Sequence, residues 1–328
     1  MINENPIFQP FSDFAFDDFH CFLTGEKTDG QQFMPIFPDW LCQEFGLADQ
    51  PFKLLDESFT TYIKLTLPCS QFAMENFITP LQNKVKAKFK NGYSDFSTLS
   101  DLEIFQWTGL MMYGIIVTEL KLALSQRENN EPLSIAPSLI KKFTHHHLAL
   151  LSLTGQIEFD EVKPWSIFLM EVKQGAYLFD YRDELNTMIF SAQFNGIGLI
   201  ICLQDNGANA IYHEELYQKT RFIKLHPIQF QEFAARIYYS GYLLNPTAEY
   251  VISKKEGKST MSALPYSIMP GKQLFARWEN KTYGQVLEAF WKTWGFVKFE
   301  ILKNPEKPIS FIENENGILN ELEIDLPL

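Results

Sequence analysis

The longest apolar stretch of the chain runs from residue 100 to residue 126. It opens with Ser100-Asp101-Leu102-Glu103, a capping box in which a hydroxyl and a carboxylate satisfy free N–H groups at a helix start. The apolar residues that follow cover most of the helix circumference, which is typical of a helix buried in a core or spanning a membrane. Its uncharged run, residues 104–118, is shorter than the roughly 18 residues that a bilayer requires. The pattern therefore predicts a buried core helix.

Two further helices are expected on either side of it. Thr79-Pro80-Leu81-Gln82 has the same capping-box form and predicts a helix over residues 79–89. Another helix is expected to begin at Pro137 and to end at Gly155. It contains His145, His146 and His147, but neighbours on a helix point about 100° apart and cannot converge on one ion. The sequence therefore predicts no metal site.

The second half of the chain changes to short apolar runs separated by turn residues. Asn195-Gly196 stands between two of these runs, and Asn-Gly is the strongest short signal for a two-residue β-hairpin. The runs predict an antiparallel meander. Its strands are expected over residues 165–172, 176–181, 187–194 and 197–203.

Helical patterns return at Pro227 and at Thr282, and a strand is expected over residues 296–302. Together the elements predict an α+β fold in two regions. A mainly helical N-terminal region is expected over residues 1–155. It packs with an α+β region over residues 156–328, in which an antiparallel sheet carries helices.

Composition narrows the classes of partner. The net charge is −12 and the chain has five arginines, whereas nucleic-acid affinity is built largely on contacts between cations and phosphates. We therefore expect neither a nucleic acid nor a membrane as partner, and no cofactor, because no Gly-rich phosphate loop is present. The chain begins without a signal-peptide pattern, and its cysteines form no C-x-x-C pair. Free thiols and a cytoplasmic location are expected.

One charged pattern in the second half suggests catalysis. Asp160 precedes a predicted strand that ends with Glu171-Val172-Lys173. This arrangement is similar to the catalytic pattern of restriction-endonuclease-like nucleases. The resemblance implies that the two carboxylates hold a divalent metal and that Lys173 helps to orient the attacking water. A metal-dependent hydrolase is therefore the alternative function, and a solvated strand face is the simpler reading of Glu171 and Lys173.

Phenylalanine and aspartate alternate near the N-terminus. Phe8, Phe11 and Phe14 precede Asp17 and Asp18, and 30 phenylalanines in all make the chain rich in aromatic rings. Such a segment either docks into a partner or is pinned to the protein by its own rings. The main hypothesis is a non-catalytic protein that binds another protein, with a basic surface, through an acidic and aromatic-rich surface. A small-molecule pocket lined by aromatic residues is a third possibility.

Overall fold

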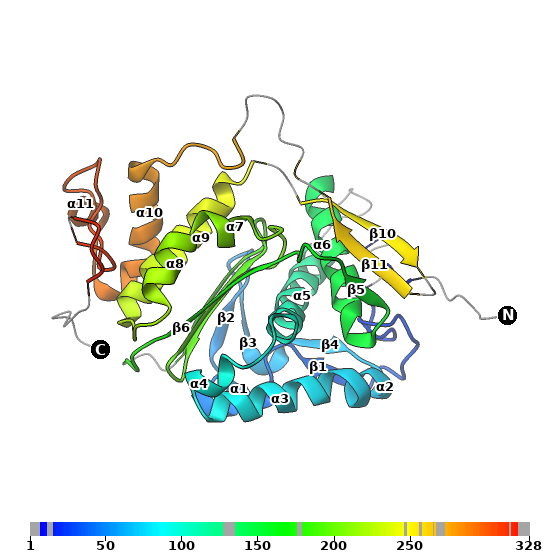
Figure 1. Cartoon of the computed structure of the whole chain (residues 1–328). Helices are drawn as coiled ribbons and strands as arrows, with labels where there is room; N and C mark the ends of the chain where they lie inside the picture. Colours follow the sequence, from blue (N-terminus) through cyan, green and yellow to red (C-terminus); the bar gives the residue numbers. More distant parts are fainter. Residues whose placement is uncertain are drawn as a thin grey trace. The chain divides into compact units, whose positions relative to one another are not determined.

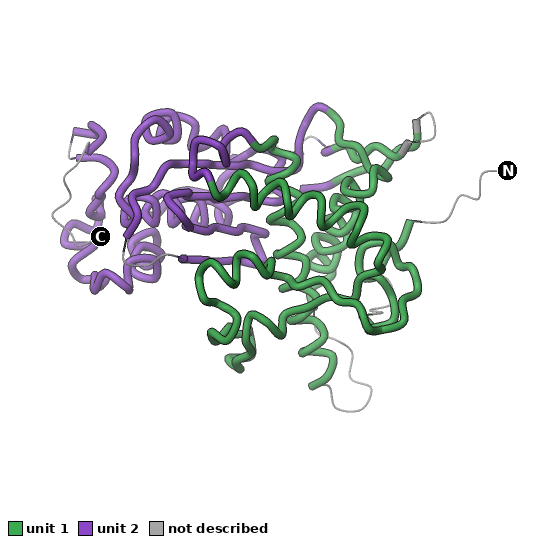
Figure 2. The backbone as a smooth tube through the Cα atoms, turned by 90° about the horizontal axis from the view of Figure 1, so that it is seen from below, with its two compact units in different colours: residues 1–90, 99–160, 250–262 green, residues 91–98, 161–249, 263–328 purple. Residues whose placement is uncertain are grey.

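The computed structural model describes residues 7–11, 16–126, 135–175, 179–245, 248–255, 258–264, 266, 273–314 and 316–320, in two compact units (Figure 2). Unit 1 comprises residues 1–90, 99–160 and 250–262, and unit 2 comprises residues 91–98, 161–249 and 263–328. Helices dominate the N-terminal half and the antiparallel sheet lies in the C-terminal half. The α+β class predicted from the sequence is confirmed.

Helix α5 (Asp101–Ser125) forms the centre of unit 1 (Figure 1). The predicted capping box is present, because Ser100 Oγ accepts from the Glu103 N–H at 3.3 Å and Glu103 Oε2 accepts from the Ser100 N–H at 2.9 Å. Fifteen residues of α5 are buried, and α6 (Pro137–Leu150) and α3 (Thr79–Lys90) pack against it. Among the described helices, α5 alone is long and apolar enough to span a bilayer. Its burial makes it a core helix.

Helix α3 begins at Thr79, as predicted, but it continues an earlier helical segment and Thr79 does not cap it. The segment begins eight residues earlier, with α2 (Gln71–Ala73), and continues through the π-helical turn η2 (Met74–Ile78) into α3. Ser70 is the true cap, since its Oγ accepts from the Ala73 N–H at 3.2 Å. Pro80 has no N–H and its ring crowds the carbonyl four residues before it, so a continuing helix has to widen at this point. The π turn provides that widening.

Short elements complete unit 1. Strands β1 and β4 form one antiparallel pair, and β2 and β3 form another. A third sheet has the order β10-β11-β5, in which β11 is parallel to β5. Strand β10, although it follows unit 2 in the sequence, belongs to this small sheet of unit 1. The bounds are β1 (Phe33–Pro35), α1 (Asp39–Phe45), β2 (Pro51–Lys53), β3 (Phe59–Thr61), η1 (Tyr62–Lys64), β4 (Thr66–Pro68), η3 (Leu151–Thr154), β5 (Ile157–Phe159), β10 (Tyr250–Lys255) and β11 (Lys258–Ala263).

Unit 2 contains a four-stranded antiparallel sheet of order β6-β9-β8-β7. The strands are β6 (Ser166–Glu171), β7 (Phe179–Glu184), β8 (Ile189–Phe194) and β9 (Ile197–Cys202). The Asn195-Gly196 hairpin is confirmed, with φ of 46° and 76° at its two turn residues. The full meander is wrong, because β6 pairs with β9 and not with β7. Strands β8 and β9 are buried along their whole length, so each needs a neighbour on both sides, and the polar β7 remains at the edge.

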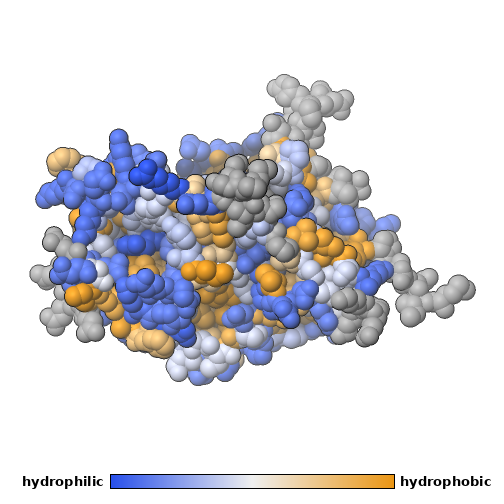
Figure 3. Space-filling view, turned by 45° about the horizontal axis from the view of Figure 1, so that its top comes forward, coloured by the Kyte–Doolittle hydropathy of each residue, from blue (hydrophilic) through white to orange (hydrophobic). Residues whose placement is uncertain are grey.

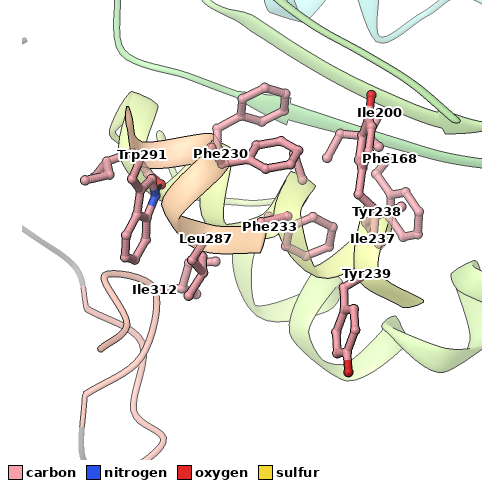
Figure 4. Close-up of a cluster of buried hydrophobic side chains, with 14 of the residues drawn as sticks. Phe168, Ile200, Phe230, Phe233, Ile237, Tyr238, Tyr239, Leu287, Trp291 and Ile312 are labelled. Atoms are coloured by element: carbon pink, nitrogen blue, oxygen red, sulfur yellow. Dashed lines mark hydrogen bonds between the residues drawn. The ribbon is translucent and has the colours of Figure 1, made fainter. Parts of the chain in front are cut away.

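Helices α9 (Pro227–Leu243) and α10 (Asn280–Trp291) supply most of the core of unit 2. Figure 4 shows the rings of Phe230 and Phe233 from α9 close to Leu287 and Trp291 from α10. The remaining elements are α4 (Tyr93–Phe96), α7 (Ala208–Tyr212), α8 (Glu214–Thr220), η4 (Lys292–Trp294) and α11 (Lys298–Ile301).

Two boundaries in this C-terminal part differ from the prediction. The strand expected over residues 296–302 is the short helix α11, and α10 begins at Asn280, two residues before Thr282. The Glu300 carboxylate accepts from the Val297 N–H at 3.2 Å, which closes a helical turn. Ile301 is the one buried residue of α11, so the alternating burial of a half-buried strand is missing. Local hydrogen bonding therefore prevails over the β-forming composition of this segment.

Candidate functional site

The hairpin β2–β3 and the turn after it expose three large apolar side chains in unit 1. Leu55, Phe59 and Ile63 are 72%, 67% and 59% exposed. Figure 3 shows one face of the molecule, on which hydrophobic surface is interspersed with hydrophilic surface. Single exposed apolar residues are ordinary, but three within nine positions of one hairpin are candidates for contact with another molecule. These three residues are called the hairpin surface below.

Hydrogen bonds fix the backbone of this hairpin. The Leu54 N–H donates to the Ser58 carbonyl at 2.9 Å, and Glu57 holds the left-handed conformation that closes the turn, with φ of 68°. Asp56 Oδ1 accepts from both the N–H and the hydroxyl of Ser58, at 2.9 and 2.6 Å. These hydrogen bonds hold the pKa of Asp56 below its usual value, and the bond from the Ser58 hydroxyl has the largest effect. The turn therefore keeps an ionised carboxylate beside its apolar residues.

The end of α5 tethers the same turn. The Leu55 N–H donates to Glu119 Oε1 at 3.0 Å, and Gln126 Nε2 donates to Asp56 Oδ2 at 2.7 Å. Both bonds join residues more than 60 positions apart in the sequence. A turn held in this way presents its side chains without a large loss of backbone freedom on binding. The hairpin surface is thus apolar, acidic at its tip and preorganised.

The aromatic residues predicted near the N-terminus pack on the body of unit 1. Phe11 is 2% exposed and its ring lies 6.0 Å from that of Tyr113, while the ring of Phe8 lies edge-on to that of His147 at 5.6 Å. Phe14 lies outside the described residues. The rings of Phe8 and Phe11 therefore contribute to packing, whereas Phe19 of the same segment is 60% exposed.

The two predicted acidic residues of this segment are exposed and have partners. Asp17 accepts from the Phe19 N–H at 2.8 Å and bonds the His20 ring at 2.8 Å. Asp18 pairs with Lys121 of α5 at 2.7 Å. Asp18 therefore ties the N-terminal segment to α5, whereas the partners of Asp17 lie within that segment.

The residues of the predicted catalytic pattern fall in different units. Asp160 is an exposed residue of unit 1 that accepts from the Ser262 hydroxyl at 2.9 Å. Glu171 and Lys173 belong to unit 2, where Glu171 pairs with Lys224 at 3.0 Å and the Lys173 N–H donates to the Leu225 carbonyl. Within the described ranges, no three His, Cys, Asp or Glu side chains are grouped so as to hold a metal ion. The metal-dependent hydrolase stays a prediction from the sequence pattern.

The three consecutive histidines have separate environments in unit 1. His146 Nε2 bonds the Gly109 carbonyl at 2.9 Å, and His147 Nε2 bonds the Phe22 carbonyl at 3.0 Å. His145 lies edge-on to Tyr250 at 5.1 Å. Burial lowers the pKa of both His146 and His147 to about 4. These two side chains are therefore neutral at physiological pH, and each satisfies a backbone carbonyl of a different segment.

A buried polar network in unit 2 was missed by sequence reasoning. Asp205 Oδ2 accepts from the Ser166 hydroxyl at 2.7 Å and from Asn209 Nδ2 at 3.0 Å. The network of hydrogen bonds then continues through Ser240. Its hydroxyl donates to Asn209 Oδ1 at 2.6 Å and is also hydrogen-bonded to His213 Nε2 at 2.9 Å. Burial raises the pKa of Asp205 to about 6.

This network joins parts of unit 2 that are far apart in the sequence. Its members come from β6, from the turn after β9, from α7 and its C-cap, and from α9, and Ser240 is 0% exposed. Perturbed pKa values are common at active sites, but they also arise in structural networks. The network therefore holds elements together, and no signal in the sequence linked residues spread over 75 positions.

Comparisons with protein-family models, with curated proteins and with solved structures found no match to this chain.

Proposed function

We propose that this chain is a non-catalytic protein that binds another protein through the hairpin surface of unit 1. The observation that carries the proposal is the exposure of Leu55, Phe59 and Ile63 on a turn fixed by hydrogen bonds. Interfaces typically combine a small apolar centre with a polar rim, and preorganisation lowers the entropy lost on binding. Here Asp56 supplies an acidic rim, next to Glu57, whose side chain is 82% exposed and pairs with Lys53 at 3.4 Å.

The charge of the whole chain favours a basic partner. A net charge of −12 attracts a positively charged protein over distances comparable with the Debye length, which raises the rate of encounter. The same charge disfavours nucleic acid and anionic membrane surfaces. The proposal keeps the cytoplasmic location expected from the sequence, and it requires no cofactor.

Site-specific photocrosslinking tests this function. Phe59 is replaced by p-benzoylphenylalanine and the full chain is irradiated in cells of the organism from which the sequence comes. We expect one dominant adduct of defined mass, and its yield in lysate should fall as salt is raised from about 50 to about 300 mM, because screening weakens attraction between opposite charges.

The matched control is the same replacement at Phe299, which is 80% exposed in unit 2. It should not give that adduct. The additional change Leu55→Ser should reduce the yield at position 59 without lowering the thermal stability, since Leu55 is 72% exposed. Equal adducts at positions 59 and 299, or none at position 59, would show that the hairpin surface binds no partner.

A further inference from the structure

A pocket of about 300 Å³ opens on unit 1 between β1, α1 and the helix formed by α2, η2 and α3. This volume lies at the lower end of the range for small-molecule sites. Met34 from β1 and Met74 and Ile78 from η2 supply apolar wall. The π turn therefore contributes directly to the lining, and such turns occur frequently at functional sites.

The aromatic wall of the pocket is Trp40 of α1. Its indole is stacked on Trp107 at 6.3 Å between ring centroids, with 17° between the planes, and it packs on Phe89 at 5.0 Å. Trp107 and Phe89 are buried, so they fix the position of the Trp40 ring. A half-buried indole held in this way offers a flat apolar surface with little freedom left to lose.

Gln82 of α3 is oriented by the same two tryptophans. Its Oε1 accepts from Trp40 Nε1 at 3.4 Å and from Trp107 Nε1 at 3.2 Å. An indole nitrogen can only donate, so the side-chain oxygen has to face the indoles and the amide nitrogen has to be the other end. No residue in the described part of the chain accepts from Gln82 Nε2. The pocket is therefore lined by an amide donor with its two hydrogens unused.

The pocket also has two charged groups that are not paired with each other. Lys86 lies one helical turn after Gln82 and is half-buried, and no carboxylate of the described residues lies within 4.0 Å of its ammonium. Asp39 lines the pocket from α1, and among the same residues no lysine or arginine nitrogen lies within 4.0 Å of its carboxylate. The lining thus combines a cation and an amide donor on α3 with an anion on α1.

We propose that this pocket binds a small aromatic carboxylate that also carries an N–H group. The ring packs against Trp40, the carboxylate accepts from Lys86 and from Gln82 Nε2, and the N–H group donates to Asp39. Lys86, Gln82 and Asp39 then each have a partner on the ligand, which an apolar ligand of the same size does not provide. This site uses none of the residues of the hairpin surface, so it is independent of the proposed protein-binding function.

The test uses 4-aminobenzoate as the probe for the full chain. The indole N–H signals of Trp40 and Trp107 in NMR spectra, assigned with Trp40→Phe, report on binding. We expect 4-aminobenzoate to shift these signals at millimolar concentrations. Benzoate, which lacks the donor, and 4-aminobenzamide, which lacks the carboxylate, should bind about tenfold more weakly, the loss of one charge-assisted hydrogen bond.

Two lysine variants separate the pocket from a general effect of charge. Lys86→Met should remove the preference for 4-aminobenzoate over 4-aminobenzamide, while Lys90→Met, at an exposed position one turn further along α3 and outside the lining, should leave that preference unchanged. Their thermal unfolding should match that of the unmodified chain. The proposal is overturned if 4-aminobenzoate leaves both indole signals in place, if the three probes bind equally, or if Lys86→Met keeps the preference.

Discussion

Replacing Glu232 by glutamine is expected to destabilise unit 2 by about 3–5 kcal/mol, the usual cost of breaking a buried ion pair. Glu232 is 0% exposed on α9, and its carboxylate accepts from Arg236 at 3.0 Å and from the Ser310 hydroxyl at 2.7 Å. It also accepts from the N–H groups of Phe311 and Ile312, at 2.6 and 3.1 Å. Glu232→Gln removes the negative charge and turns an amide donor toward groups that are themselves donors.

Urea unfolding and hydrogen exchange measure this effect. The amide protons of Phe311 and Ile312 should exchange faster in Glu232→Gln, because the one oxygen that accepts from both of them loses its negative charge. Glu306→Gln provides the control, since it makes the same chemical change at an exposed position of unit 2. If Glu232→Gln unfolds at the same urea concentration as Glu306→Gln with both amides still protected, the carboxylate does not hold this segment.

Unit 1 is expected to lose stability steeply as the pH falls from 6.5 to 4. Burial lowers the pKa of both His146 and His147 in the folded chain to about 4, whereas an unfolded histidine titrates at 6.5. Between these values the unfolded chain binds a proton on each histidine and the folded chain does not. Stability therefore rises with pH across this window. The two shifts correspond to about 3 kcal/mol each at pH 4, which together are comparable with the total stability of a domain.

Variants of the two histidines test this dependence. Hydrogen exchange of the α5 amides at pH 7 and pH 5 should show a loss of about 2 kcal/mol per histidine in the unmodified chain. His146→Gln and His147→Gln should each remove about half of that difference, because glutamine does not titrate, even though both lower the stability at pH 7. His20→Gln, at a partly exposed position, is the control. A difference between the two pH values that survives in the double variant would contradict the assignment.

The stability of unit 2 should fall less steeply than that of unit 1 as the pH is lowered. Burial lowers the pKa of His213 to about 3, and the charge of Arg236 adds to that effect, so His213 acts in the same direction as His146 and His147. Asp205 acts in the opposite direction, because its raised pKa of about 6 means that the folded chain binds a proton before the unfolded chain does. As the pH falls from 6 to 4, protonation of Asp205 stabilises the folded chain and offsets part of the stability that is lost through His213.

Local signals in the sequence were sufficient for several elements. The capping box at Ser100 marked the start of α5, and Asn195-Gly196 marked the β8–β9 hairpin. In both cases the residues that form the feature are within four positions of each other, so the chemistry that decides it is local. The absence of a C-x-x-C pair likewise predicted free thiols, and all four cysteines are free and buried.

Features that depend on contacts between distant residues could not be predicted from the sequence. Thr79 looked like a helix cap, but the preceding segment packs as a helix and Ser70 takes that role. The order of the sheet was missed because β6 pairs with β9, about 30 residues further along the chain. The candidate sites could not be predicted either, because nothing in the sequence near Phe59 indicates that its side chain is exposed, whereas that of Phe11 is buried. Gln82 acquires its orientation from Trp40 and Trp107, which come from two other helices.

The sequence alone determined the α+β class, the buried central helix and the tight hairpin, because periodicity, caps and turn residues act over one or two helical turns. The tertiary structure decided which apolar side chains stay exposed, which carboxylates are buried and which groups line a pocket. These properties arise from contacts between segments far apart in the chain, and the free energy of such contacts depends on burial, which no short stretch of sequence specifies.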